Sequence, residues 1–167
     1  MTDFKYNDGG RELAGYKGKT GDCVTRAISI ATEKPYQEVY DDLVQWAKDY
    51  SLTRNDRVAK AMRKAKSGSL RSTSPRNGVY KEVYKSYLES IGWEWVTCNE
   101  IGQSEKVHLD ASELPKGRII CKCSRHLTTM IDGVINDTYN PQRKHLGYPN
   151  ERMVYGYYRK SETPYSF

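Results

Sequence analysis

A cysteine at the predicted start of a helix is the most chemically distinctive residue of the sequence. Cys23 follows Asp22, a residue type favoured just before a helix, and apolar residues then recur at helical spacing through Val24, Ala27 and Ile28. The N-terminus of a helix stabilises negative charge, so it lowers the pKa of a thiol there and favours the reactive thiolate. A small buried core residue is the alternative interpretation, because free cysteine is among the most buried residue types.

A later stretch of the chain predicts a hairpin that carries a histidine and an aspartate. Asp132-Gly133 is a strong two-residue turn signal between two runs of strand-forming residues. Side chains alternate between the faces of a strand, so the register set by this turn places His126 and Asp137 on one face. They are diagonal neighbours there, with Cα atoms about 7–8 Å apart, and Asn136 points to the opposite face.

These residues together fit the parts of a nucleophilic catalytic site. A cysteine nucleophile needs a base, and the base needs an acceptor that orients it. We predict that Cys23 is the nucleophile, His126 the base and Asp137 the orienting residue. The other two histidines are weaker candidates, because His108 lies in a polar connector and His145 in a loop. An edge histidine and a turn aspartate without a catalytic role are the structural alternatives.

Helical periodicity dominates the first part of the chain, and strand-like alternation dominates after Gly92. Helices followed by antiparallel strands are typical of an α+β domain, and 167 residues suffice for a substantial core. We predict a single domain over 1–167, in which the helix that begins at Cys23 packs on a C-terminal antiparallel sheet and a polar arm precedes that helix. The predicted helices are 23–33, 35–50 and 79–91, and the predicted strands are 93–98, 118–123, 126–131, 134–139 and 153–158.

A basic segment separates the second and third of these helices. Residues 54–76 have eight lysine and arginine residues and only one acidic residue, Asp56, so their net charge of +7 accounts for the +6 of the whole chain. We expect a helix up to Lys66 and then an exposed loop rich in serine and glycine. Arg63, Lys64 and Lys66 are candidate contacts for an acidic protein or peptide substrate, and a solvated basic surface is the alternative. Nucleic-acid binding is a less favoured use of the same charge.

The composition disfavours several classes of protein. There is no charged-then-apolar signal at the N-terminus and no apolar run of membrane-spanning length, so we expect a cytoplasmic protein with reduced cysteines and no membrane partner. Cys121, Cys123 and His126 suggest a metal site as an alternative, but a structural zinc site needs a fourth ligand. We therefore predict no bound metal. No pattern in the sequence predicts an oligomeric state.

The loop before Cys23 resembles that of the papain-like cysteine peptidases. That family carries Gln-Gly-x-Cys-Gly-Ser-Cys ahead of its central helix, and Lys17-Gly18-Lys19-Thr20-Gly21-Asp22-Cys23 keeps both glycines at the same spacing from the nucleophile. The segment from His126 to Asp137 resembles the shorter hairpin of the bacteriocin-processing peptidases of peptide exporters. Between residues 7 and 157 the chain is also similar to small papain-like proteins of phages and bacteria.

The resemblance implies a papain-like fold and a cysteine hydrolase that acts through a thioester acyl-enzyme. A peptidase, an isopeptidase and an amidase all fit, none of them needs a cofactor, and a phage-encoded enzyme would act in the host cytoplasm. The family's oxyanion-hole glutamine falls on Lys17, a flexible point charge in place of a fixed amide, so Asn7 is the alternative donor. The alternative functions are a transglutaminase-like acyl transferase and a non-catalytic basic binding module with a vestigial triad.

Overall fold

The computed structural model describes residues 1–18, 21–65, 74–99 and 105–162. These residues form four α-helices, one short 3₁₀ helix and six strands, which together make an α+β structure. The helices are α1 (Cys23–Thr32), α2 (Tyr36–Thr53), α3 (Arg57–Lys64), α4 (Lys81–Ser90) and the 3₁₀ helix η1 (Lys144–Leu146). The strands are β1 (Asp3–Tyr6), β2 (Trp93–Thr97), β3 (Arg118–Cys123), β4 (His126–Ile131), β5 (Val134–Asp137) and β6 (Gly156–Lys160).

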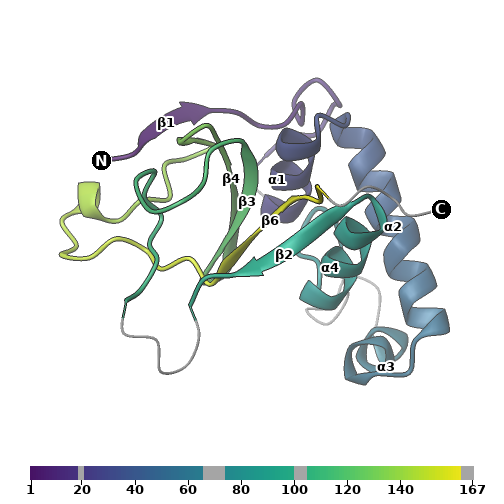
Figure 1. The fold of residues 1–167 in the computed structure, drawn as a ribbon. Coiled ribbons are helices and arrows are strands. Elements are labelled where there is room, and N and C mark those ends of the chain that lie inside the picture. The colour runs from purple at the N-terminus through teal and green to yellow at the C-terminus, as the bar shows by residue number, and fades with distance from the viewer. Residues whose placement is uncertain (19–20, 66–73, 100–104, 163–167) are drawn as a thin grey trace.

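The six described strands pair in one sheet, in the order β1-β5-β4-β3-β6-β2. β1 lies parallel to β5, and the other neighbouring strands are antiparallel. Helix α1 packs against β4 and lies between the sheet and α2, while α4 contacts both α2 and β2. Figure 1 shows α3 at the far end of α2, away from β4 and β5.

Helix α1 is the buried centre of the structure because apolar residues cover most of its circumference. All residues from Val24 to Ala31 are buried, and the polar ones among them need internal partners. The Thr25 hydroxyl donates to the Pro75 carbonyl at 2.6 Å. From the sheet, the Thr129 hydroxyl donates to the Ala27 carbonyl at 2.7 Å. These bonds fix the helix, and with it Cys23, against the sheet.

Alternation along β3 divides the interior into two cores on opposite faces of the sheet. Ile120 packs in the helix-side core with α1. Ile119 and Cys121 pack in a loop-side core with Leu109 and Val154 from the connecting loops. The sheet is therefore covered by helices on one face and by loops on the other. No helix in the described part of the chain is long and apolar enough to cross a membrane.

The prediction of an α+β structure with α1 packed on the sheet is confirmed. β3 and β4 have the predicted bounds, and α1, α2, α4 and β2 begin and end within about three residues of theirs. The hairpin register also agrees, because Ile131 pairs with Val134 and Met130 with Ile135. β5 is shorter than predicted, since it ends at Asp137.

The sheet is mixed and not antiparallel, because β1 adds a parallel strand that the sequence does not predict. All four residues of Asp3–Tyr6 are exposed, so no burial pattern marks this strand. It is held at the sheet edge by pairing with Val134–Asp137 of β5. The polar arm thus reaches beyond the loop before Cys23 and becomes part of the sheet.

The bounds of the last strand also differ from the prediction. β6 spans Gly156–Lys160, whereas the alternation of the sequence predicts 153–158. The Tyr155 N–H donates to the Lys122 carbonyl at 2.9 Å, but regular pairing begins only at Gly156. A Cβ atom on that glycine would lie 2.3 Å from the Trp95 ring, so glycine is needed where β6 passes this side chain.

Candidate active site

The three predicted catalytic residues come together at one end of the β4–β5 hairpin. His126 begins β4 and Asp137 ends β5, so both lie at the hairpin end away from its turn, and Cys23 begins α1. His126 Nε2 lies 2.7 Å from Asp137 Oδ2, and the Cys23 side chain is close enough to the imidazole to raise its pKa. A carboxylate only accepts, so Nε2 carries a proton in this contact and Nδ1 is left for the thiol.

Further donors fix the Asp137 carboxylate. The Thr128 hydroxyl donates to Oδ2 at 2.7 Å, and the Thr138 backbone N–H donates to Oδ1 at 2.7 Å. The residue is only 3% exposed, so these bonds replace the water that would otherwise solvate its charge. Asn136 has a different partner, because its Oδ1 accepts from Asn7 Nδ2 at 3.1 Å. The structure thus pairs His126 with Asp137 and not with Asn136, as the hairpin register predicts.

The surroundings favour a charged pair of Cys23 and His126. Burial is the largest influence on the Cys23 pKa and raises it. The hydrogen bond and charge of His126 outweigh burial, helped by the Leu127 N–H and the Arg26 charge, so the pKa lies below its usual value. Burial also opposes protonation of His126, but its bonds to Asp137 and Cys23 raise its pKa overall. For Asp137, burial raises the pKa, but the hydrogen bond and charge of His126, together with its other hydrogen bonds, lower it by more. The net shift of the Asp137 pKa is therefore downward.

The pKa values of the other three cysteines are shifted in the opposite direction, upward. Burial raises the pKa of Cys98, brings that of Cys123 to about 11 and places that of Cys121 well above its usual value. Cys121 and Cys123 pack in the loop-side core, whereas the two ring nitrogens of His126 contact Asp137 and Tyr139. Among the described residues, no group of three His, Cys, Asp or Glu side chains is placed to hold a metal ion.

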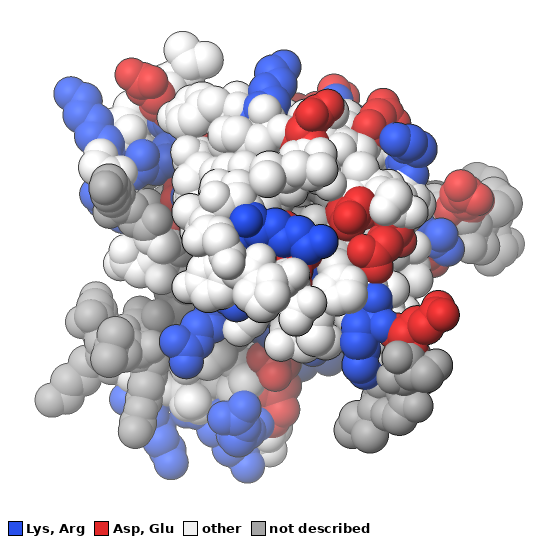
Figure 2. Space-filling view, turned by 90° about the vertical axis from the view of Figure 1, so that its left-hand side faces the viewer, with Lys and Arg blue, Asp and Glu red and all other residues white. Residues whose placement is uncertain are grey.

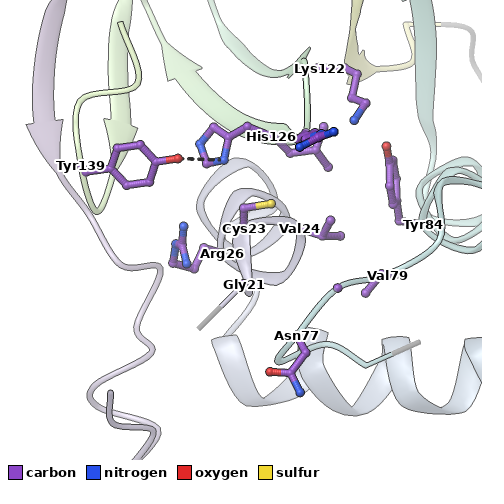
Figure 3. Close-up of a pocket in the computed structure, with 13 residues that line it drawn as sticks. Gly21, Cys23, Val24, Arg26, Asn77, Val79, Tyr84, Lys122, His126 and Tyr139 are labelled. Carbon is purple, nitrogen blue, oxygen red and sulfur yellow. Dashed lines mark hydrogen bonds between the residues drawn. The ribbon is translucent and has the colours of Figure 1, made fainter. Parts of the chain in front are cut away.

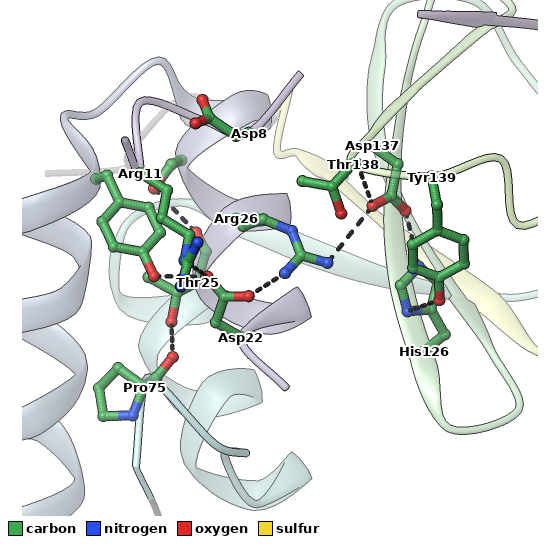
Figure 4. Close-up of polar contacts among 12 residues, drawn as sticks. Asp8, Arg11, Asp22, Thr25, Arg26, Pro75, His126, Asp137, Thr138 and Tyr139 are labelled. Atoms are coloured by element: carbon green, nitrogen blue, oxygen red, sulfur yellow. Dashed lines mark hydrogen bonds and ion pairs between the residues drawn. The ribbon is translucent and has the colours of Figure 1, made fainter. Parts of the chain in front are cut away.

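A buried line of charges continues from Asp137 into α1. Arg26 Nη2 lies 3.5 Å from Asp137 Oδ1, and Arg26 Nη1 contacts Asp22 Oδ1 (Figure 4). The other Asp22 oxygen meets Arg11 Nε at 3.0 Å and accepts from the Tyr36 hydroxyl at 2.7 Å. Asp22 does occupy the position before the helix, but its side chain makes no capping hydrogen bond. Its carboxylate holds Arg26 behind the candidate triad.

A cavity of about 430 Å³ opens beside Cys23. In Figure 3, Lys122 and Tyr84 lie on one side of Cys23 and Tyr139 lies on the other. The Tyr139 hydroxyl is 3.3 Å from His126 Nδ1, the nitrogen that also faces the thiol. The cavity thus gives a substrate access to the thiol between two walls with different polar groups.

The two candidate oxyanion donors are not brought into this cavity. The Lys17 side chain is exposed and does not line it. Asn7 does not line it either, because its Nδ2 donates to Asn136 and its Oδ1 accepts from the Gly9 N–H at 2.9 Å. The backbone N–H of Cys23, at the start of α1, is the donor that the fold does supply.

The predicted basic contacts also lie elsewhere. Arg63 donates to the carbonyls of Ser51 and Arg54, at 2.6 and 2.8 Å, and so closes the C-terminal end of α2. Lys64 is exposed on α3, and neither residue lines the cavity. Lys66 lies outside the described residues. The helical part of the basic segment, α3, therefore docks on α2 and away from β4 (Figure 1), whereas the end of the segment at Pro75 contacts Thr25 of α1.

The opposite side of the molecule from α3 carries mixed charge. Figure 2 shows this face, which includes β1 and η1. Uncharged side chains make up much of it, and lysine and arginine side chains, some of them near its centre, are interspersed with aspartate and glutamate. Nucleic-acid-binding faces usually concentrate positive charge in a patch or stripe, so this face gives no support for such a partner.

Four residues of the site region are not among the predicted site residues. Two of them do have a signal in the sequence, because Arg26 follows Asp22 at helical spacing and the hairpin register places Tyr139 opposite His126. Lys122 and Arg125 line the cavity from the β3–β4 hairpin. No local pattern indicates that this hairpin borders the helix that carries the cysteine.

Comparison of the chain with protein-family models, with curated proteins and with solved structures finds no match. The function is therefore inferred from the geometry and electrostatics of the site.

Proposed function

We propose that the protein is a papain-like cysteine hydrolase, either a peptidase, an isopeptidase or an amidase, which forms a thioester at Cys23. The observation that carries this proposal is the hydrogen-bonded pair His126–Asp137 next to Cys23, which begins a buried helix and lines the same cavity as His126. A nucleophilic cysteine is activated by a base that a third group orients. The lowered pKa of Cys23 and the raised pKa of His126 are those of a thiolate–imidazolium pair.

The first half of the reaction would make the acyl-enzyme. His126 takes the thiol proton, and the Cys23 thiolate attacks the carbonyl carbon of the substrate. Negative charge moves to the carbonyl oxygen, where the Cys23 backbone N–H stabilises it. The C–N bond then breaks as His126 returns the proton to the leaving amine, and a thioester remains. Throughout both transfers, Asp137 accepts a hydrogen bond from the Nε2–H group of His126 and stabilises the imidazolium.

The second half would release the acid. His126 takes a proton from water, and the resulting hydroxide attacks the thioester carbonyl. The C–S bond breaks, the acid leaves, and the sulfur regains the proton from His126. A primary amine in place of water would give a new amide, so hydrolysis and acyl transfer differ only in this step. The proposed chemistry uses side chains and water, and needs no cofactor.

An acyl donor with intact-mass readout tests the proposal. With a p-nitrophenyl ester, the wild-type protein should gain one acyl group on Cys23 and lose it again to water. Cys23→Ser and His126→Ala should not, whereas Cys98→Ser, which removes a different thiol, should behave as wild type. Transfer of the acyl group to added amine faster than to water would favour the transferase. If the wild type is acylated no faster than Cys23→Ser, the hydrolase proposal is wrong and the hypothesis of a non-catalytic binding module is favoured.

A further inference from the structure

One wall of the cavity holds positive charge that no acidic side chain balances. Lys122 and Arg125 line it, and no aspartate or glutamate is among the lining residues. Within the described ranges, neither cation forms an ion pair or a side-chain hydrogen bond. The third cation of the lining, Arg26, is already shared between Asp22 and Asp137. The charge of Lys122 and Arg125 is thus left for a ligand.

The hydroxyl of a tyrosine with a buried ring belongs to the same wall. Tyr84 is 3% exposed and lines the cavity. In Figure 3 its hydroxyl and the Lys122 amine point toward the same part of the cavity. Within the described ranges no hydrogen bond from the Tyr84 hydroxyl is seen, and this oxygen is not fully buried, so it is open to the cavity that Tyr84 lines. A ligand atom that accepts hydrogen bonds could bond both the Tyr84 hydroxyl and the Lys122 amine.

Lys122 reaches the cavity because of the alternation of β3. It pairs with Leu127, which packs in the helix-side core, so its side chain lies on the face of α1. The amine is half-buried, and burial, together with the charges of Lys81 and Arg152, lowers its pKa although the Cys23 and Cys123 sulfurs oppose this. Holding a cation in such a place costs free energy unless an anion joins it.

Arg125 is held in an unusual backbone conformation. Its φ is 56°, in the left-handed region that favours glycine or asparagine, and it immediately precedes His126. A non-glycine residue is strained in this region, and such strain collects at binding and catalytic sites. The strained turn places a guanidinium, which can bind a carboxylate through two parallel hydrogen bonds, beside the base of the candidate triad.

We propose that Lys122, Arg125 and Tyr84 form a subsite for a carboxylate of the substrate, next to the bond that Cys23 attacks. The proposal rests on the proposed function, because it takes Cys23 as the reacting atom. The carboxylate belongs either to an acidic side chain or to a chain terminus, since both present the same two oxygens. This acidic preference resides in the cavity wall, and not in Arg63 and Lys64 of α3.

Two alkylating reagents that differ in one charge test the subsite without a known substrate. Iodoacetate carries a carboxylate and iodoacetamide does not, while both react with the same thiolate. The ratio of their rates at Cys23 therefore cancels any change in the thiol pKa. In the wild type this ratio should exceed that of free N-acetylcysteine by about tenfold, and the excess should fall as salt rises. A ratio equal to that of the free thiol overturns the proposal.

Three variants and two matched controls locate the effect. Lys122→Gln and Arg125→Asn should each lower the ratio by about three- to tenfold, and asparagine keeps the left-handed turn. Tyr84→Phe, which removes only the hydroxyl, should lower it by about threefold. Lys64→Gln makes the same charge change on α3, and Tyr87→Phe removes a hydroxyl that bonds Asp42, so both should match wild type. Equal losses in variants and controls overturn the proposal.

Protection of Cys23 from iodoacetamide by pools of random octapeptides identifies the source of the carboxylate. One pool has a single glutamate and an amidated C-terminus, a second has glutamine and a free C-terminus, and a third has neither carboxylate. Protection by the first assigns a side chain, protection by the second a terminus, and equal protection by all three overturns the subsite. A protein that passes these tests but fails to turn over acyl donors retains the subsite and loses the proposed function.

Discussion

Arg26 Nη2 lies 3.5 Å from Asp137 Oδ1, so a cation from α1 stands behind the carboxylate that bonds His126. Arg26 is 7% exposed and also contacts Asp22. A buried ion pair contributes little net stability, but loss of one partner leaves an uncompensated charge. The contact therefore ties the helix of the proposed nucleophile to the strand of the orienting residue.

Arg26→Met should destabilise the protein by about 3–5 kcal/mol, because Asp22 and Asp137 lose the cation between them. Arg11→Met is the matched control: its side chain is 14% exposed and pairs with Asp22 alone, so the loss should be clearly smaller. Urea unfolding followed by tryptophan fluorescence measures both losses. Equal losses would show that the contact between Arg26 and Asp137 adds nothing to the free energy of unfolding.

Limiting iodoacetamide at pH about 6 should label Cys23 before the other cysteines. Its pKa is lowered despite burial, whereas burial raises the pKa of Cys98, Cys121 and Cys123. His126→Ala should slow the labelling about tenfold, because the thiolate loses its charged partner. Peptide mass mapping after short exposure gives the order. Faster labelling of Cys98 in the folded protein would remove Cys23 as the nucleophile.

Asp137→Ala should lower kcat for acyl-donor hydrolysis by about 10²-fold or more, since the imidazole loses the acceptor that orients it. Asp137→Asn keeps the shape and separates this loss from a failure to fold. Asn136→Ala removes the bonds of its side chain to Asn7 and to the Val134 carbonyl but none to His126, so it should cost about 1–2 kcal/mol of stability and little kcat. Similar kcat losses at both positions would contradict the assigned roles.

Acid should destabilise the folded protein through Asp137. Burial raises its pKa, but the His126 contact and other hydrogen bonds lower it overall, below the unfolded value of about 3.9. Its contribution to the free energy of unfolding is therefore present above that value and lost as the pH falls through the folded pKa. Urea unfolding between pH 2 and 6 should show a steeper decline for wild type than for Asp137→Asn. Parallel curves would mean that Asp137 contributes nothing to acid stability.

Local patterns predicted the hairpin half of the candidate site. The Asp132-Gly133 turn and the alternation around it fix the register, and the register alone brings His126 to Asp137. The start of α1 at Cys23 is likewise visible in the spacing of apolar residues. Both features depend on neighbours within a few turns or pairs, which is the range over which periodicity is informative.

The remaining features depend on contacts between distant segments. Both faces of β3 are buried, so its alternation cannot tell which face receives α1, and Lys122 carries no sign that it reaches the cavity. β1 has no buried side chain and is held by backbone pairing. The expectation for Lys17 came from the resemblance of its loop, but nothing in the loop directs that side chain inward, and it is exposed.

The pairing of β1 with β5 bears on when the site assembles during synthesis. The Asn7 N–H donates to the Asp137 carbonyl at 2.9 Å, and 129 residues separate Asn7 from its side-chain partner Asn136. The N-terminal strand leaves the ribosome long before β5 is translated, and closing so long a loop slows this pairing. A nascent chain therefore exposes Cys23 and the unpaired β1 before the proposed base His126 and the orienting residue Asp137 have been made. On this account the proposed hydrolase is inert toward neighbouring chains on the polysome until translation has passed residue 137.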